Sequence, residues 1–565
     1  MFFAHIRHSQ FLTLYKFWRV FWVDATSVDT VEGSFKYISL ALGIENSSAA
    51  VKQRLSISKE HWLLVFDNAD NPTIDISKYF PLSGNLIITS RNPSCAIYAS
   101  ESNSHVEVDK METDEAISLL LKVARTDSSD AIREDAERLV SDLGFLALAI
   151  DQAGSFIATR KCPLKEYRDT FRDCRDRNRL LRQPPTWKSR SDPKSAVYTT
   201  WEISFEMVFQ MDDLASQILQ LMSYLHYAQI PREIFSRASD RVHYDKTSIS
   251  DIQWTKSRVS KEIYYLLCAR KDEDNQNWDD DIFEGTIDIL QSFSLMKRER
   301  HEGQAIYTLH PLVSSWTRER LPEREQLPIK QSIVCIMNKS IQTCFRRSRT
   351  DLQFQRRMFA HVEAFQEHFP EYFECNEKTE SNILCEMINF AKVYKQFGSW
   401  KKAEKLEVQI MKTSWRVHGQ EHPDTLTSMG NLATTYIDQG RWKEAEELNV
   451  QVMETRSRVL GQEHPDTMTS MANLALTYTI QGRWNEAEEL HVNVMEMRKR
   501  VIGQEHPDTL TGMRNIAWTL HLKGRVDEAI ALMGNVAHLS SCTLGKDHPF
   551  TKLSVYTLVK WRAVK

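Results

Sequence analysis

The C-terminal part of the chain repeats itself with a step of 42 residues. The tetrapeptide His-Pro-Asp-Thr occurs at 422–425, 464–467 and 506–509, and a weaker copy, His-Pro-Phe-Thr, occurs at 548–551. Between these marks the sequence is nearly copied. A period of about 20 to 50 residues is typical of stacked units, none of which can bury its apolar face alone. The end of the chain is therefore predicted to be a repeat array, a structure that mostly binds proteins or peptides.

Each repeat unit is predicted to contain two helices. Asp424 is the candidate cap of the first helix, because its side chain can accept free N–H groups of the opening turn. Apolar residues follow at helical spacing, and Gly440 suits the left-handed position at the helix end. The second helix is predicted to begin near Trp442 and to end at Gly461.

The contact between the two helices of a unit is expected to depend on small residues. Ala433 and Ala445 would let the helices approach closely. Trp442 and Trp484 are expected to pack between helices rather than to contact a ligand.

An asparagine recurs on the predicted first helices, at Asn431, Asn473 and Asn515. First helices of stacked pairs line the concave surface of such an array. A side-chain amide carries both a donor and an acceptor, so it can hold the backbone of an extended peptide. These three asparagines are the predicted partner-binding residues. The alternative is that they form hydrogen bonds within their own repeats.

The units resemble the tetratricopeptide repeat, in the 42-residue form of kinesin light chains. The matching residues are Leu432, Ala433, Tyr436, Gly440, Ala445 and Leu448, and then Leu474, Ala475, Tyr478, Gly482, Ala487 and Leu490. A divergent earlier copy contains Ala391 and Gly398, and a later one contains Ala517 and Gly524. The resemblance implies an all-α solenoid over residues 381–565 that binds a protein or peptide.

Length and charge limit the classes of function. A chain of 565 residues is expected to form two to four domains. A formal net charge of −4 argues against a general nucleic-acid or membrane-surface binder. The nine cysteines form no CxxC pair, which fits a reducing compartment, and no apolar run is long enough to span a membrane. The expected location is cytoplasmic.

The N-terminal half alternates short apolar strands with amphipathic helices, an order that predicts a doubly wound α/β fold. The predicted strands are residues 20–25, 62–67, 85–90 and 106–108, and the predicted helices are residues 30–42, 47–59, 114–124 and 131–143. Near-continuous apolar strands suit a parallel sheet that is buried on both faces.

One strand ends in an acid that could carry chemistry. Residues 62–66 are apolar, and Asp67 and Asn68 follow at the carboxyl end, where open α/β sheets bind ligands. Asp67 could hold Mg²⁺ through water. The simpler alternative is a buried strand that happens to end in aspartate.

Further segments resemble the NB-ARC module of the STAND family, which contains nucleotide-operated switches and many fungal receptors. Arg91 matches the sensor arginine, residues 144–149 match the GLPLA motif, and His310 matches the histidine of the MHD motif. The resemblance implies a P-loop-NTPase-like module that binds ADP or ATP with Mg²⁺. Its implied nucleotide contacts are Asp67, Asn68, Arg91, Ala147 and His310, and Asp67 is the implied metal ligand.

Three departures from this family weaken nucleotide binding or hydrolysis. Residues 1–565 contain no G-x-x-x-x-G-K-[ST] sequence, so the phosphates lack their cradle. Ala147 replaces the proline of the GLPLA motif, and Asn68 replaces a second carboxylate. Hydrolysis by this chain is therefore not expected. A truncated gene model and a decayed copy both explain the missing loop.

The expected architecture is multidomain. A partial NB-ARC domain covers residues 1–160, helical and winged-helix subdomains cover 161–325, a helical connector covers 326–380, and the repeats cover 381–565. The leading hypothesis is an NLR-like or STAND signalling or regulatory protein, and the resemblance implies homo-oligomerisation on activation. One alternative is a nucleotide-independent scaffold with a relic NB-ARC part. A second is a motor–cargo adaptor, although no heptad coiled coil precedes the repeats.

Overall fold

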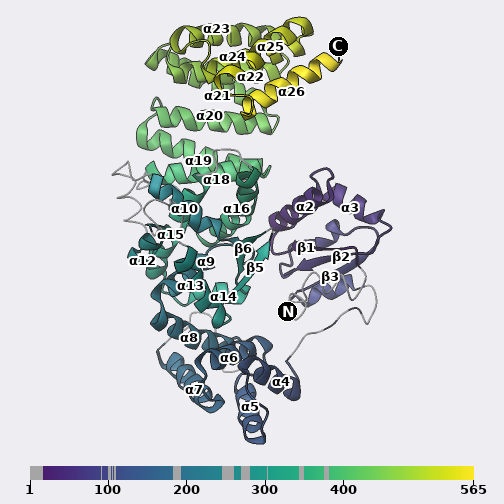
Figure 1. The fold of residues 1–565 in the computed structure, drawn as a ribbon, viewed down its shortest axis with the longest axis vertical. Helices are drawn as coiled ribbons and strands as arrows, with labels where there is room; N and C mark the ends of the chain where they lie inside the picture. Colours follow the sequence, from purple (N-terminus) through teal and green to yellow (C-terminus); the bar gives the residue numbers. More distant parts are fainter. Residues whose placement is uncertain are drawn as a thin grey trace. The chain divides into compact units, whose positions relative to one another are not determined.

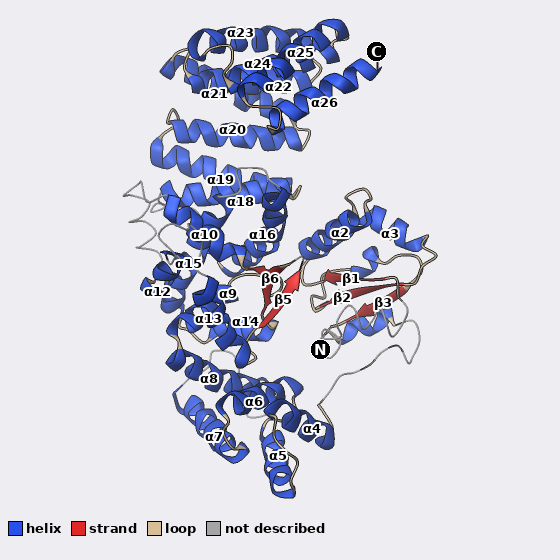
Figure 2. Ribbon diagram, in the orientation of Figure 1, coloured by secondary structure: helices blue, strands red, loops and turns tan. Residues whose placement is uncertain are grey.

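The computed structural model describes most of the chain (Figure 1). The described residues are 17–90, 92–99, 104, 106, 110–181, 193–244, 260–268, 280–301, 303–342, 349–373 and 381–564. They divide into two units. The first contains the described residues up to Gly154 together with 162–169 and 193–197, and the second contains 155–161, 170–181 and everything from Tyr198 onwards. Helices dominate, and strands form two small sheets (Figure 2).

The first unit contains a parallel three-stranded sheet. Strands β1 (Arg19–Asp24), β2 (Trp62–Asp67) and β3 (Asn85–Ile88) lie in the order β1-β2-β3. The first five residues of β2 are buried, and they alternate between two apolar clusters on opposite faces of the sheet. This pattern confirms the prediction of a parallel sheet buried on both faces.

The helices of the first unit agree with the sequence prediction to within a few residues. Figure 1 shows α2 and α3 on one side of the sheet, where Phe35 and Leu55 join the apolar cluster. The helices are α2 (Val28–Leu42), α3 (Ser48–Ser56), α4 (Thr113–Ala124), α5 (Asp130–Asp142) and α6 (Ala147–Arg160), and the 3-10 turns are η2 (Ile76–Tyr79) and η3 (Pro93–Tyr98). Most of the strand predicted at 106–108 lies outside the described residues.

The second unit begins with helices around a small antiparallel sheet. Strands β4 (Ile230–Pro231), β5 (Lys297–His301) and β6 (Gln304–Thr308) lie in the order β4-β6-β5. Two helices, α7 (Leu164–Leu181) and α8 (Pro193–Met211), begin with residues of the first unit and continue in the second. The other helices here are α9 (Asp213–Ser223), α10 (Glu233–Tyr244), α12 (Lys261–Cys268), α13 (Asp280–Ser292) and α14 (Pro311–Glu319). Trp201 and Trp316 are buried side by side, with ring centroids 5.8 Å apart.

The connector packs against the start of the array. It consists of α15 (Glu323–Gln342), α16 (Arg349–His368) and the short α17 (Pro370–Phe373), and α18 (Ser381–Gln396) contacts both long helices. Buried Asn389 donates to Asn338 Oδ1 at 2.6 Å, and the hydroxyl of Tyr394 donates to Gln366 Oε1 at 2.6 Å. Buried hydrogen bonds of this kind hold α18 in one register.

The array is a stack of antiparallel helix pairs (Figure 1). After α18 its helices are α19 (Trp400–His418), α20 (Pro423–Asp438), α21 (Trp442–Leu460), α22 (Pro465–Ile480), α23 (Trp484–Ile502), α24 (Pro507–Leu522), α25 (Val526–Thr543) and α26 (Pro549–Val564). Even-numbered members are the first helices of their repeats and odd-numbered members are the second helices. The two-helix prediction is confirmed, including the helix ends at Gly440 and Gly461, where φ is 78° and 89°.

The caps of the first helices differ from the prediction. His422, not Asp424, is the N-cap of α20, and its Nδ1 accepts the backbone N–H of Asp424 at 3.2 Å. Pro423 occupies the first helical position, where its missing N–H costs nothing, so the cap lies one residue before it. The same geometry recurs at His464, His506 and His548.

The small residues are placed as predicted, whereas the tryptophans are not. Ala433 and Ala445 have no exposed surface. The prediction that Trp442 and Trp484 pack between helices is wrong, since their side chains are 44% and 39% exposed. Each stands at the first position of a second helix, beside the turn, where its neighbours cover only part of the ring.

An ion-pair cluster recurs every 42 residues at three successive joints between repeats. Glu446 of α21 accepts from Arg483 at 2.6 Å and from Gln481 at 2.8 Å, and the Arg483 guanidinium lies over the Tyr478 ring at 4.1 Å. The preceding joint uses Glu404 with Arg441, and the following one uses Glu488 with Arg525, both at 2.6 Å. We name these pairs the inter-repeat clusters.

Removal of one inter-repeat cluster should weaken its joint. Glu446→Ala should lower the free energy of unfolding of the neighbouring repeats by about 1 kcal/mol, because Arg483 and Gln481 lose a partly buried carboxylate acceptor. Glu463→Ala is the matched control, since Glu463 and Arg500 are 57% and 66% exposed and such pairs contribute little. Urea denaturation followed by far-ultraviolet circular dichroism measures both. Equal losses of unfolding free energy in the two variants would show that the inter-repeat cluster does not stabilise its joint.

Candidate functional site

Three asparagines form a regular row on the first helices. Asn431 of α20, Asn473 of α22 and Asn515 of α24 are half-buried and 42 residues apart. Their backbone carbonyls accept hydrogen bonds from Thr435, Thr477 and Thr519. Within the described parts of the chain their side-chain amides make no hydrogen bond. The row, which we name the amide face, therefore has donors and acceptors available to a partner.

A second polar row lies inside the array and has a different role. Glu407, Asn449 and His491 occupy equivalent positions on successive second helices, and each is at most 4% exposed. The Asn449 amide donates to Thr477 Oγ1 at 3.0 Å, and Thr435 donates to Glu407. These bonds tie a second helix to the first helix of the next repeat. Asn449 is buried and already bonded to Thr477, which distinguishes it from the asparagines of the amide face.

Large apolar side chains share the amide face in its later part. Leu476 and Ile480 lie three and seven residues after Asn473, so they fall on the same side of α22. Trp518 and Leu522 have the same relation to Asn515, and all four side chains are 39–46% exposed. The corresponding residues of α20 are Thr434 and Asp438. Sequence reasoning missed this apolar extension, although the spacing from each asparagine predicts it.

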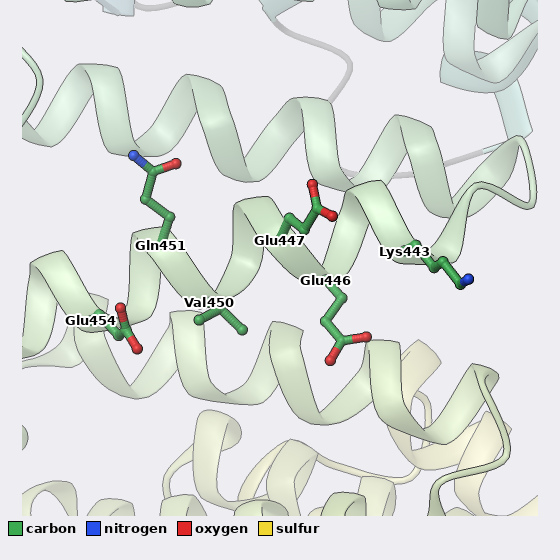
Figure 3. A pocket seen from close by; sticks show the side chains of 6 residues that line it. All are labelled: Lys443, Glu446, Glu447, Val450, Gln451 and Glu454. Atoms are coloured by element: carbon green, nitrogen blue, oxygen red, sulfur yellow. The ribbon is translucent and has the colours of Figure 1, made fainter.

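An open groove of about 580 Å³ lies elsewhere, along α21. It is lined by Lys443, Glu446, Glu447, Val450, Gln451 and Glu454. Figure 3 shows Glu447 and Gln451 directed toward one neighbouring helix, and Glu446 and Val450 toward the other. Glu446 is already bonded within its inter-repeat cluster. The groove is thus an exposed acidic helix surface rather than an enclosed ligand site.

Asp67 and Asn68 lie together at the carboxyl end of β2, as predicted. The Thr89 hydroxyl donates to Asp67 Oδ1, and the Asn68 backbone N–H donates to Thr89 Oγ1 at 3.1 Å. Asn68 has a positive φ of 58°, an uncommon conformation that asparagine tolerates. Asp24 ends β1 directly beside Asp67, and its Oδ1 accepts hydrogen bonds from the backbone N–H and the hydroxyl of Thr26. Two neighbouring carboxylates therefore stand at this edge, each held by a threonine.

The other residues predicted to contact a nucleotide are Ala147, His310 and Arg91. Ala147 is half-buried at the start of α6, after Gly144 and Phe145, both of which have a positive φ. Asp67, Asn68 and Ala147 belong to the first unit and His310 to the second, and each is described within its own unit. Arg91 lies outside the described residues.

His310 caps a helix. Its Nδ1 accepts the backbone N–H of Leu312 at 3.1 Å at the start of α14, with Pro311 in the first helical position. This is the geometry of the His-Pro caps of the repeats. Burial, reinforced by the charge of Lys297, lowers the pKa of His310 to about 4. At neutral pH the ring is uncharged, and its proton is on Nε2, which can donate.

Binding of a nucleotide or a metal ion by these residues stays a prediction. Within the described ranges, no group of three or more His, Cys, Asp or Glu side chains is placed to hold a metal ion. The sequence contains no glycine-rich phosphate loop, and Asp67 already accepts from Thr89.

The geometry of paired helices in a 42-residue register defines a helical repeat protein. Residues 425–466, 467–508 and 509–550 each match the tetratricopeptide repeat family. The C-terminal part of this chain is thus an array of tetratricopeptide repeats, a class that offers extended surfaces to other proteins.

The chain is also similar to a nucleotide-binding leucine-rich repeat (NLR)-like protein of Hyaloscypha variabilis. The two are 29% identical over 441 residues, which cover 72% of this chain and 39% of the relative. The chain thus aligns with about two fifths of that relative's length.

The chain is also similar to solved structures of other repeat proteins. The nearly identical TPR-like repeats of a kinesin-light-chain-type protein from Podosopora anserina are 26% identical, with a TM-score of 0.30, and the match covers 36% of this chain and 96% of that one. A STAND protein with a tetratricopeptide repeat sensor from Pyrococcus horikoshii is 11% identical, with a TM-score of 0.33, over 97% of this chain and 81% of that one. None of the described helices is both long and apolar enough to cross a bilayer.

The buried His491 should make the array sensitive to acid. Burial and the nearby Arg498 lower its pKa to about 4 in the folded state, against about 6.5 in the unfolded state. Its contribution to stability is therefore complete above pH 6.5 and is lost as pH falls toward 4, because the unfolded chain takes up the proton first. At pH 5 the loss should be about 1–2 kcal/mol.

His491→Asn tests this expectation, since it copies Asn449 from the preceding repeat and removes the titrating group. Amide hydrogen exchange in α22–α24 at pH 7 and pH 5, corrected for intrinsic exchange, measures the local stability. Wild type should lose more protection on acidification than the variant does. The same loss in both proteins would show that His491 is not responsible.

Proposed function

We propose that this chain is an NLR-like signalling or regulatory protein of the STAND type, whose repeats bind a partner protein. The similarity to the NLR-like relative and the tetratricopeptide repeats support this proposal. So does the order of elements, in which a parallel α/β sheet precedes a winged-helix-like segment and then a repeat array. We propose a cytoplasmic location and homo-oligomerisation on activation, as in that class of receptor.

The amide face is the proposed partner-binding surface. Its three side-chain amides recur at equal steps and are not used within the described structure, so they can bond to the backbone of an extended segment. Leu476, Ile480, Trp518 and Leu522 add apolar contact area beside two of them. This combination of a few placed polar groups with apolar surroundings is typical of peptide recognition.

Replacement of Asn431, Asn473 and Asn515 by alanine should abolish peptide capture while the array stays folded. Peptides would be selected against the full chain from a random 12-residue library displayed on phage, and their affinities would be measured by fluorescence anisotropy. The triple variant should bind them at least about tenfold more weakly, since each lost amide hydrogen bond contributes about 0.5–1.5 kcal/mol.

Asn449→Ala is the matched contrast for this experiment. Asn449 is buried and bonded, so its loss should lower the melting temperature of the array. The triple variant should keep that temperature within a few degrees. Unchanged capture by the triple variant, or its loss of fold, would show that the amide face does not bind the partner.

We further propose that the α/β unit belongs to the ADP-binding switch class, with Mg²⁺ as the accompanying ion. Asp67, Asn68, Arg91, Ala147 and His310 are the residues that this class would use. Asp67 and Asn68 stand where open parallel sheets bind ligands, which supports the proposal.

The chain of residues 1–565 should bind ADP or ATP with a Kd no tighter than about 100 μM, because it has no phosphate cradle. Isothermal titration calorimetry with ADP, ATP and Mg²⁺ measures this directly, with Asp67→Ala as the control for site-specific heat. A micromolar site that Asp67→Ala removes would contradict the expectation and would favour a working switch.

The calorimetry also separates the proposed function from its main alternative. A nucleotide-independent scaffold requires peptide capture that is unaffected by ADP and by Asp67→Ala. A switch requires that nucleotide changes capture. The motor–cargo adaptor gains no support from the described helices before the repeats, which pack as globular subdomains.

A further inference from the structure

Two neighbouring second helices carry opposite charges at the same repeat positions. Lys405 and Lys412 of α19 are followed 42 residues later by Glu447 and Glu454 of α21. All four side chains are exposed, and within the described residues none of them forms an ion pair or a hydrogen bond. Because α19 and α21 both pack on α20, the array presents a basic second helix next to an acidic one.

Side chains that can pack lie on the same side of these two helices. Val408 and Val450 are half-buried, and each stands between the two charges of its own helix at the same repeat position. Trp415 is 50% exposed and follows Lys412 by three residues, which places both on one side of α19. Ser457 has the position of Trp415 in α21. We name this surface the outer strip, and its members are Lys405, Val408, Lys412 and Trp415 of α19 with Glu447, Val450, Glu454 and Ser457 of α21.

The acidic half of the outer strip is hollowed. The open groove of about 580 Å³ along α21 is lined by three of its members, Glu447, Val450 and Glu454. Figure 3 shows their side chains spaced along the helix. Such a groove can receive the side of another helix, whereas it does not enclose a small molecule.

The outer strip is complementary to itself. A two-fold axis that runs along α19 and α21, between them, would place α19 of one copy on α21 of a second copy. Each side chain of α19 then meets the side chain at its own repeat position in the second copy. Both lysines meet glutamates, a valine meets a valine, and the exposed Trp415 meets the small Ser457. The symmetry forms every one of these contacts twice.

Other arrangements of two copies bring like charges together. If α21 faced its own counterpart, glutamates would oppose glutamates, and α19 on α19 would oppose lysines in the same way. The strip positions of α23 are Glu489 and Glu496, so α21 on α23 is also unfavourable. In the arrangement described above, Lys401 meets Lys443, but both lie in the first turns of their helices. A partner segment with one sign of charge would complement only half of the strip, so the charges favour a second copy.

We propose that the outer strip joins two copies of this chain in a two-fold dimer. The dimer requires neither a nucleotide nor a bound peptide, so the proposal goes beyond the proposed function and can fail without affecting it. The amide face lies on the first helices and stays available in each copy. Exposed ion pairs each contribute little and the contact is narrow, so we expect a Kd of about 10–100 μM.

Charge reversal tests the dimer, because K405E/K412E makes the whole strip acidic and E447K/E454K makes it basic. Sedimentation velocity of the full chain at about 1–300 μM should show a reversible wild-type dimer. Its Kd should rise at least about fivefold between about 50 mM and 500 mM NaCl, since exposed charges are screened. Each double variant alone should dimerise at least about tenfold more weakly than wild type. An equimolar mixture of the two should associate like wild type, because lysines again meet glutamates.

Two control variants separate the strip from general charge and folding effects. E489K/E496K makes the same charge change at the same repeat positions of α23, outside the strip, and should dimerise like wild type. The variant that combines both double changes restores opposite charges and should also dimerise like wild type. Circular dichroism checks that every variant is folded.

Four results would overturn the proposal. The first is a wild-type chain that stays monomeric at the highest concentration; binding of octalysine to that monomer, lost in E447K/E454K, would then assign the acidic half to a basic partner. The second is a dimer that neither double variant weakens, which would place self-association elsewhere on the chain. The third is equal disruption by E489K/E496K. The fourth is a mixture of the two double variants that does not associate.

Discussion

The burial of one small alanine on each helix of a repeat is the constraint on which the repeat array depends. Ala433 and Ala445 have no exposed surface, and the same holds for Ala475 with Ala487 and for Ala517 with Ala529. A larger side chain at either position would push the helix backbones apart. The inter-repeat clusters and the buried polar row both require the helix spacing that these small side chains allow, since their hydrogen bonds tolerate displacements of only a few tenths of an ångström.

With the backbone spacing set, the repeats differ in the polarity of their interior and surface. The equivalent buried position is Glu407, Asn449, His491 and finally Met533, which becomes fully apolar. On the amide face, Thr434 and Asp438 are followed by Leu476 and Ile480 and then by Trp518 and Leu522. The buried row and the amide face thus both become less polar toward the C-terminus. A partner that follows the array would meet hydrogen-bonding groups first and apolar groups later.

Much of this fold could be predicted from the sequence, because strong periodicity reports directly on helices and on their stacking. The strand at 62–67 and the helix pairs lie where the pattern places them. The predicted N-cap of α20 was wrong because His422 and Asp424 are both plausible caps by residue type. Which of the two caps the helix depends on Pro423 in the first helical position. The exposure of Trp442 could not be predicted, since an aromatic residue at a helix start has the same spacing whether it is covered or not.

The candidate site was less accessible to sequence reasoning. The bond from Thr89 to Asp67 joins residues on neighbouring strands, and pattern alone does not give strand register. His310 resembles a family motif, but its use as a cap is visible only beside the other His-Pro helices. The amide face could be predicted because its members recur at the repeat step itself.

The recurrence of the inter-repeat clusters has a consequence for the length of such proteins. Glu404, Glu446 and Glu488 each receive an arginine from the following repeat, so these three joints share the same ion pair. Excision of residues 442–483 would join Arg441 to Trp484, and Glu486 would take the place of Glu444 beside that arginine. Loss or gain of one unit therefore creates no foreign junction. The number of repeats can change by recombination between near-identical stretches of coding sequence, and the reach of the binding surface changes in whole steps with it.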